Sequence, residues 1–274
     1  MTGAPSTDRA TPRRHIRRVA IGALAAAAVI LSGCAGAAST APSPGAAEGG
    51  LTGSLTVYAA ASLHGAFDDL LTVFAEEHPD VAVQPLVTDG SSALATQIIE
   101  GAPADVFASA DERIMQQVVD AGVVADPVVF AANTLVLVTP TGNPAGIADL
   151  ADLADATVVL CEPDVPCGAA SRTLLQNAEV SVTPASLEQN VTAVMTKVAA
   201  GEADAGLVYA TDVVGRDDVE VIVPDTAADV VNLYPIAVTT GAVSDDVARA
   251  FVALVTGPEG QRVLADAGFA SAGP

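Results

Sequence analysis

Short apolar runs alternate with amphipathic stretches along the chain from residue 55 onward. Uniformly apolar strands that are each followed by a helix are typical of a parallel sheet covered on both faces. The pattern predicts helices that begin at Ser62 and span 91–100, 111–121, 147–153, 167–177, 190–200, 244–255 and 258–267. It predicts strands at 55–59, 81–87, 103–109, 133–139, 157–161, 205–209, 219–223 and 230–238.

One stretch, 55–67, shows the arrangement that other parts of the chain repeat. A buried strand ends at three small residues, and Ser62 then stands where a helix N-cap is expected. Similar turns into helices occur at 88–92, 166–169 and 189–192. A single serine here would suggest only a structural cap, but the repetition favours a binding site. Helix N-termini present unpaired N–H groups and the positive end of the dipole, so they can bind an anion without a cationic side chain.

The order of the strands predicts how the chain is divided. The sheet is left near residue 133 and re-entered near 234, which indicates an α/β fold of two doubly wound lobes joined by two crossing segments. Lobe 1 is expected to comprise 51–132 and 236–274, and lobe 2 to comprise 133–235. Ligands of such sheets lie beyond the carboxyl ends of the strands. We therefore expect the four helix starts to converge on one cleft.

The first fifty residues have the pattern of an export signal and a tether. Arginines precede the apolar run 19–31, which is too short to span a membrane. The run ends in Leu-Ser-Gly-Cys, which resembles a bacterial lipobox with Cys34 as the lipid-bearing residue; the alternative is an ordinary signal with a chance cysteine. We predict a signal peptide at 1–33, a flexible tether at 34–50, and an exported protein anchored by lipidated Cys34 to the outer face of the cytoplasmic membrane.

Charge excludes one class of partner. Removal of 1–33 leaves 6 basic and 32 acidic residues, a net charge of −26. No basic surface is then available to neutralise phosphates, so nucleic acid is not an expected partner. An anionic ligand would have to be bound by local dipoles, against the field of the whole protein.

Two cysteines, Cys161 and Cys167, remain once Cys34 is assigned to the lipid. In an exported protein, two nearby cysteines most often form a disulfide, which we predict here. If the two cysteines were metal ligands, the site would need more cysteine or histidine ligands than the chain offers. We therefore predict no metal cation site. A hydrolase with Cys167 as nucleophile and His64 as base lacks a third residue and is incompatible with the disulfide, so an enzyme is not expected.

Several motifs together resemble a known family. They are Val-Tyr-Ala-Ala-Ala-Ser-Leu at 57–63, Gly-Ala-Pro-Ala-Asp-Val-Phe-Ala-Ser-Ala-Asp at 101–111, Gly-Leu-Val-Tyr-Ala-Thr-Asp at 206–212 and Tyr-Pro-Ile-Ala at 234–237. In this order and spacing, the sequence resembles the molybdate-binding proteins of ABC transporters, which have the type II periplasmic-binding-protein fold. The resemblance covers residues 53–269. It implies a monomer that binds molybdate or tungstate, needs no cofactor and delivers its ligand to an ABC permease.

The resemblance also implies a ligand site. In that family, two hydroxyls near helix starts, two backbone N–H groups and a tyrosine hydroxyl hold the oxyanion. The corresponding groups here are the hydroxyls of Ser62 and Ser91, the N–H groups of Cys167 and Val191, and the hydroxyl of Tyr209. Such donors suit a tetrahedral dianion that has no proton to give.

Alternatives from the same fold remain open at this point. Asp89 departs from the family pattern, and we expect it to point away from the ligand and to bond the helix-start amides. If Asp89 faced inward, phosphate or a phosphonate would become an alternative ligand. Whether sulfate is rejected depends on the dimensions of the cleft. A binding protein for a small organic acid would need an arginine. Arg172 is the one candidate near the predicted site, and an exposed helix position is the more ordinary interpretation of it.

Overall fold

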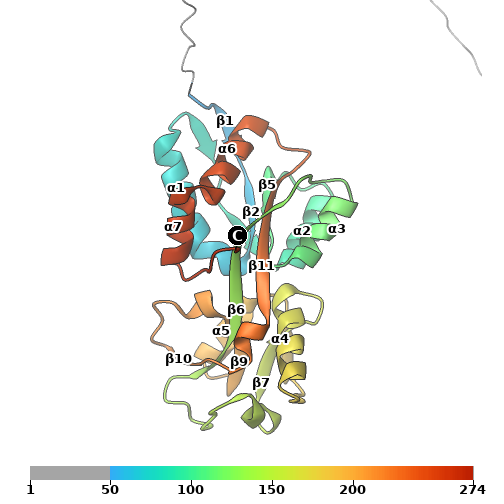
Figure 1. Ribbon diagram of the computed structural model, residues 1–274, viewed down its shortest axis with the longest axis vertical. Coiled ribbons are helices and arrows are strands. Elements are labelled where there is room, and N and C mark those ends of the chain that lie inside the picture. Colours follow the sequence, from blue (N-terminus) through green and yellow to red (C-terminus); the bar gives the residue numbers. More distant parts are fainter. Residues whose placement is uncertain (1–49, 274) are drawn as a thin grey trace, which may run out of the picture. The chain divides into compact units, whose positions relative to one another are not determined.

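The computed structural model describes residues 50–273, which belong to one compact unit (Figure 1). The predicted signal at 1–33, the predicted lipid attachment at Cys34 and the predicted tether as far as residue 49 lie outside the described residues. Within 50–273, no helix combines the length and the apolar character that a bilayer crossing requires.

Most strands form one nine-stranded mixed sheet in the order β4-β2-β5-β11-β6-β9-β7-β8, with β10 paired to β6. Parallel pairs join β2 to β4 and β5, and β7 to β8 and β9. Strands β1 and β3 form a separate pair. The strands are β1 (Gly53–Leu55), β2 (Val57–Ala60), β3 (Val81–Val83), β4 (Val87–Asp89), β5 (Val106–Ala108), β6 (Val128–Pro140), β7 (Val158–Cys161), β8 (Ser186–Glu188), β9 (Ala205–Tyr209), β10 (Val219–Ile222) and β11 (Val231–Val238).

The expectation of a wholly parallel sheet was wrong for the middle of the molecule. The long strands β6 and β11 run antiparallel to each other, and their neighbours β5, β9 and β10 also pair with them in antiparallel fashion. The reason is that β6 carries the chain from one half of the sheet to the other and β11 carries it back. Figure 1 shows both strands passing through the centre.

The predicted strand at 81–87 was also wrong as a single element. Pro85 lies in a break between β3 and β4, and the two short strands belong to different sheets. Proline has no N–H to donate to a ladder, so within a sheet it is confined to edges and irregularities, such as the register shift at Pro235 in β11. The short strand β8 was missed, because its sequence Ser-Leu-Glu carries almost no apolar signal.

The helices agree with the predicted positions to within a few residues. Asp111 caps α3 as predicted, since its Oδ1 accepts a 2.7 Å hydrogen bond from the N–H of Ile114. The predicted helix at 147–153 is instead the 3₁₀ turn η2 (Leu150–Ala154). The helices are α1 (His64–Glu77), α2 (Ser91–Ile99), α3 (Glu112–Asp120), α4 (Pro166–Asn177), α5 (Val191–Ala199), α6 (Asp245–Thr256) and α7 (Pro258–Asp266), with further 3₁₀ turns η1 (Ala61–Leu63), η3 (Ala210–Val213) and η4 (Ala227–Asp229).

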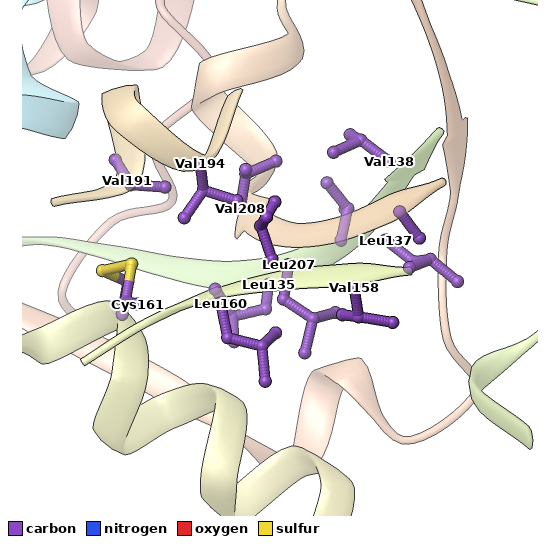
Figure 2. Close-up of a cluster of buried hydrophobic side chains, with 14 of the residues drawn as sticks. Leu135, Leu137, Val138, Val158, Leu160, Cys161, Val191, Val194, Leu207 and Val208 are labelled. Atoms are coloured by element: carbon purple, nitrogen blue, oxygen red, sulfur yellow. A yellow bond between two sulfur atoms is a disulfide. The ribbon is translucent and has the colours of Figure 1, made fainter. Parts of the chain in front are cut away.

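The buried apolar residues form separate cores. We use lobe 1 and lobe 2 for the two parts of the fold that surround these cores. In lobe 1, α1, α6 and α7 cover one face of the sheet and α2 and α3 cover the other (Figure 1). Lobe 2 has an aliphatic core between α4, α5 and strands β6, β7 and β9, shown in Figure 2. The boundaries predicted at 132/133 and 235/236 fall inside β6 and β11 and stay a prediction.

Candidate functional site

The predicted ligand residues line one cavity between the lobes. Ser62 and Ser91 reach it from lobe 1, whereas Cys167, Val191 and Tyr209 reach it from lobe 2. The complete lining is Ala60, Ala61, Ser62, Gly90, Ser91, Ala110, Val165, Pro166, Cys167, Gln189, Asn190, Val191 and Tyr209.

The cavity is small and its lining carries no ionisable acid or base apart from the tyrosine hydroxyl. The volume open to the centre of a water-sized sphere is about 20 Å³. A sphere of that volume has a radius of about 1.7 Å, and adding the radius of water, roughly 1.4 Å, gives a cavity about 6 Å across. Drug-sized ligands need about 300–1,000 Å³, so the cavity fits a single small ion.

Ser91 is the first residue of α2 and its side chain is almost fully buried, with 1% exposure. Its Oγ accepts a 3.0 Å hydrogen bond from the N–H of Ala110. A hydroxyl has one proton to donate, and this contact uses only a lone pair. The proton of Ser91 is therefore left for the cavity.

Tyr209 ends strand β9 and is buried to the same degree. Its Oη accepts a 3.0 Å hydrogen bond from Nδ2 of Asn232, so the phenolic proton is again left for another acceptor. Burial raises the pKa of the Tyr209 hydroxyl well above its ordinary value, and nearby Tyr234 and Asp111 add to the rise. The hydroxyl consequently stays a donor at physiological pH.

Ser62 is not the helix N-cap that the sequence suggested. It lies inside η1, the 3₁₀ turn that precedes α1, and neither helix is capped by a side chain. The extra turn moves the true start of α1 to His64, beyond the reach of the serine as a cap. The Oγ of Ser62 lies 3.0 Å from Oη of Tyr234 instead.

Cys167 and Val191 lie in the first turns of α4 and α5, where backbone N–H groups have no partner within the helix. Pro166 occupies the first position of α4, so Cys167 supplies the first available N–H. In α5, Asn190 is the N-cap, with its Oδ1 accepting from the N–H of Ala193 at 3.0 Å. The Val191 side chain packs in the lobe 2 core and anchors this helix start (Figure 2).

Asp89 is oriented as expected. Its Oδ1 accepts from the N–H of Gly90 at 2.7 Å and from Nδ2 of Asn190 at 2.9 Å, and Asp89 is not part of the cavity lining. The carboxylate is thus paired with donors of Gly90 and Asn190 and does not itself line the cavity. The bond to Asn190 also connects the two lobes.

Further bonds join the lobes on another side of the cavity. Ser92 Oγ and Arg113 Nη2, both from lobe 1, donate to the carbonyl oxygen of Asp164 in lobe 2, at 3.0 and 2.9 Å. Gly90 approaches the backbone of Gln189 so closely that a side chain there would collide with its carbonyl group. The lobes are therefore in direct contact around the cavity, which is the arrangement of a closed cleft.

The residues weighed for other activities are not arranged to support those activities. Arg172 is exposed on α4 and does not line the cavity. Cys161 and Cys167 form a disulfide with a Cα–Cα distance of 5.7 Å, as predicted, so neither is a free nucleophile. His64 has a side chain that is 63% exposed and pairs with Asp68. Across residues 50–273, no group of three or more histidine, cysteine, aspartate or glutamate side chains is placed to hold a metal cation.

Sequence reasoning missed several polar residues around the cavity. They are Asn133, Asn232 and the peptide of Ala110, together with Asp212, whose Oδ2 accepts from the N–H of Tyr209 at 2.8 Å. Burial raises the pKa of the Asp212 carboxyl from 3.8 to about 7. The two asparagines could have been found from the sequence, because each interrupts a long apolar strand.

Comparison with known proteins agrees with this geometry. The profile of the family described as "Bacterial extracellular solute-binding protein" matches residues 55–270. The "Molybdate-binding protein ModA" of Mycobacterium tuberculosis H37Rv is 45% identical over 221 residues, which cover 79% of this chain and 84% of that protein.

Solved structures share the fold at lower identity. The periplasmic molybdate-binding protein of Azotobacter vinelandii superposes with a TM-score of 0.66 at 22% identity, over 78% of this chain and 98% of that one. The sulfate-binding protein SubI of Mycobacterium tuberculosis H37Rv superposes with a TM-score of 0.67 at 20% identity, over 81% and 88% of the two chains. At these identities the likeness establishes a type II periplasmic-binding-protein fold.

Proposed function

Because this chain belongs to the bacterial extracellular solute-binding proteins, we propose that it captures molybdate or tungstate between its lobes and delivers the ion to an ABC permease. Like its relatives, the chain is a binding protein and not an enzyme. The ion is its transported ligand, and no cofactor takes part.

The observation that carries this proposal is a small cavity lined by residues that offer hydroxyl and backbone N–H donors. The hydroxyls of Ser91 and Tyr209 each accept a hydrogen bond from elsewhere in the protein, and the N–H groups of Cys167 and Val191 can only donate. Ser62 adds a further hydroxyl. Several donors around one small cavity favour a small, fully deprotonated anion.

The same cavity disfavours the alternatives. An organic acid is larger than a space about 6 Å across allows, and no arginine lines the cavity to bind a carboxylate. Phosphate keeps a proton near neutral pH and would need an acceptor, which Asp89 does not supply because it does not line the cavity and its Oδ1 already accepts from Gly90 and Asn190. Sulfate shares the charge and shape of molybdate, so the two must be separated by experiment.

Attachment and delivery complete the proposal. We infer that Cys34 carries the lipid that tethers the protein to the outer face of the cytoplasmic membrane, with residues 35–50 as a flexible spacer. A tethered monomer can close on its ligand and still reach the permease. The lobe contacts described above would stabilise the closed, loaded form that the permease recognises.

Calorimetric titration of the exported protein, purified in detergent, tests the function. Molybdate, tungstate, sulfate and phosphate are titrated in parallel at pH 8. We expect one site that binds molybdate and tungstate at least about a hundredfold more tightly than the other two ions, which corresponds to roughly 2.7 kcal/mol. Tight binding of sulfate or phosphate without binding of molybdate and tungstate would contradict the proposal.

A further inference from the structure

Each strand that crosses between the lobes carries a buried asparagine. Asn232 of β11 lies directly opposite Asn133 of β6, and the two residues are 8% and 4% exposed. A buried amide in an apolar strand costs free energy unless its polar atoms are paired. The hydrogen bonds that pair these two amides lead to hydroxyl groups at the ligand cavity.

The orientation of the Asn232 amide follows from its neighbours. Its Nδ2 donates at 3.1 Å to the carbonyl oxygen of Ala110, a group that only accepts, so the NH₂ end must face this side. The second proton of Nδ2 is then directed to Oη of Tyr209 at 3.0 Å. Because Tyr209 receives this bond, its own proton points away from Asn232.

We propose that Asn232 is a specificity-determining residue, which acts through Tyr209 so that this hydroxyl presents its proton to the ligand and disfavours oxyanions that carry a proton. The inference rests on the proposed function, since it concerns the ligand of the same site. Asn232 does not line the cavity, so its effect is one of positioning.

The backbone of Ala110 connects two of these hydroxyls. Its carbonyl group holds the amide of Asn232, and its N–H donates to Ser91 Oγ at 3.0 Å. The backbone of this one residue, through two successive peptide groups, thus leaves both the Tyr209 proton and the Ser91 proton available to the ligand. This arrangement couples hydroxyls that come from different lobes.

Asn133 is connected to the third hydroxyl, that of Ser62, through Tyr234. Its Oδ1 accepts from the N–H of Thr134 at 2.9 Å, which turns Nδ2 toward Thr211 Oγ1 at 2.8 Å and Tyr234 Oη at 3.5 Å. Tyr234 Oη lies 3.0 Å from Ser62 Oγ, and either hydroxyl can be the donor of this hydrogen bond. The proton of Ser62 is available to the cavity when Tyr234 is the donor.

A protonated oxyanion would meet this site at a disadvantage. Its O–H would face a donor, and its proton would remain unpaired in a cavity that has no room for additional water. Phosphate at pH 8 is such an ion, whereas molybdate, tungstate and sulfate carry no proton. Asn232 is therefore expected to affect the ratio of phosphate to molybdate affinity more than it affects folding.

A double-mutant cycle tests the role of Asn232. Asn232→Leu has a similar size and forms no hydrogen bond, so the Tyr209 hydroxyl is free to turn a lone pair toward the cavity. Tyr209→Phe removes that hydroxyl altogether. The wild-type protein, both single variants and the double variant are titrated with molybdate and phosphate at pH 8, and unliganded thermal melts report folding. If Asn232→Leu does not fold, Asn232→Val replaces it.

We expect Asn232→Leu to weaken molybdate binding by about tenfold or more and to lower the ratio of phosphate Kd to molybdate Kd by about tenfold. In the Tyr209→Phe background, Asn232→Leu should change this ratio less than about threefold, because the hydroxyl through which it acts is gone. An unchanged ratio in Asn232→Leu, or an equal change in both backgrounds, would overturn the inference.

Failure of the proposed function would be recognised separately. If the wild-type protein binds neither molybdate nor tungstate, the assigned ligand is wrong. The cycle is then measured with sulfate in place of molybdate. The ratio of phosphate Kd to sulfate Kd then decides the role of Asn232. A wild-type preference for phosphate over all three proton-free ions would overturn both statements.

Discussion

Gly90 offers the most direct test of whether binding depends on closure of the lobes. It is the N-cap of α2 and lies at φ −56° and ψ 134°, a conformation that alanine adopts without strain. An added Cβ would nevertheless lie within 3.0 Å of the Gln189 carbonyl oxygen, 3.4 Å from its carbonyl carbon and 3.6 Å from Cβ of Asn190. All of these atoms belong to the opposite lobe, so the collision exists only when the cleft is closed.

The size of the effect follows from this geometry. Contacts under 3.0 Å are essentially never made by real Cβ atoms, so Gly90→Ala must push the lobes apart or distort the turn before α5. Overpacking of this kind costs about 1–3 kcal/mol. If this free-energy cost affects only the closed state, it corresponds to a loss of roughly 5- to 150-fold in molybdate affinity. Stability without ligand should be unchanged, or higher by about 0.4–1 kcal/mol because alanine restricts the unfolded chain.

Calorimetry with molybdate and thermal melts without ligand measure the two quantities. Gly65→Ala is the matched control, because it makes the same change on α1 at a position where an added Cβ meets no atom within 4 Å. Molybdate binding by Gly90→Ala within about twofold of Gly65→Ala would refute the reasoning. So would a loss of affinity that is matched by an equal loss of unliganded stability.

Further predictions concern the donors, the crosslink and pH. Ser91→Ala should weaken molybdate binding roughly ten- to a hundredfold by calorimetry, whereas Arg172→Ala should not, since the arginine lies outside the cavity; the reverse result would favour charge over local donors. Replacement of Cys161 and Cys167 by serine should lower the free energy of unfolding by about 2 kcal/mol in urea titrations, because the crosslink closes a short loop; equal stability of the two proteins would argue against that estimate. The pKa of Asp212 is raised by burial from 3.8 to about 7, so the stabilisation from its protonated form is complete below about pH 4 and is lost as pH rises through about 7. Asp212→Asn should remove that part of the decline in unfolding free energy with rising pH. Equal slopes of unfolding free energy against pH for the wild type and the variant between pH 4 and 7.5 would contradict this prediction.

Residues that line the cavity could be predicted because their positions depend on local signals. Small residues after a buried strand and before an amphipathic stretch indicate a helix start, and helix starts expose N–H groups wherever the helix is placed. Ser91, Cys167, Val191 and Tyr209 were found in this way together with the family motifs, and all of them line the cavity. The role of Ser62 as a cap was wrong, because the choice between an α-helical and a 3₁₀ start depends on a fraction of a turn.

The hydrogen-bond direction at the site could not be predicted from the sequence. It depends on Asn232 reaching both the Ala110 carbonyl and the Tyr209 hydroxyl, and these groups are far apart along the chain. The mixed sheet could not be predicted for the same reason, since no local sequence feature shows that β6 and β11 run in opposite directions.

By itself, therefore, the sequence determined which elements form, where their ends expose donors and how little cationic charge is available for an anion. Only the tertiary structure decided which of those ends face one another, how small the space between them is and which way each hydroxyl donates. The physical reason is that helix starts and apolar periodicity arise from neighbours along the chain, whereas cavity size and hydrogen-bond direction arise from groups that folding brings together.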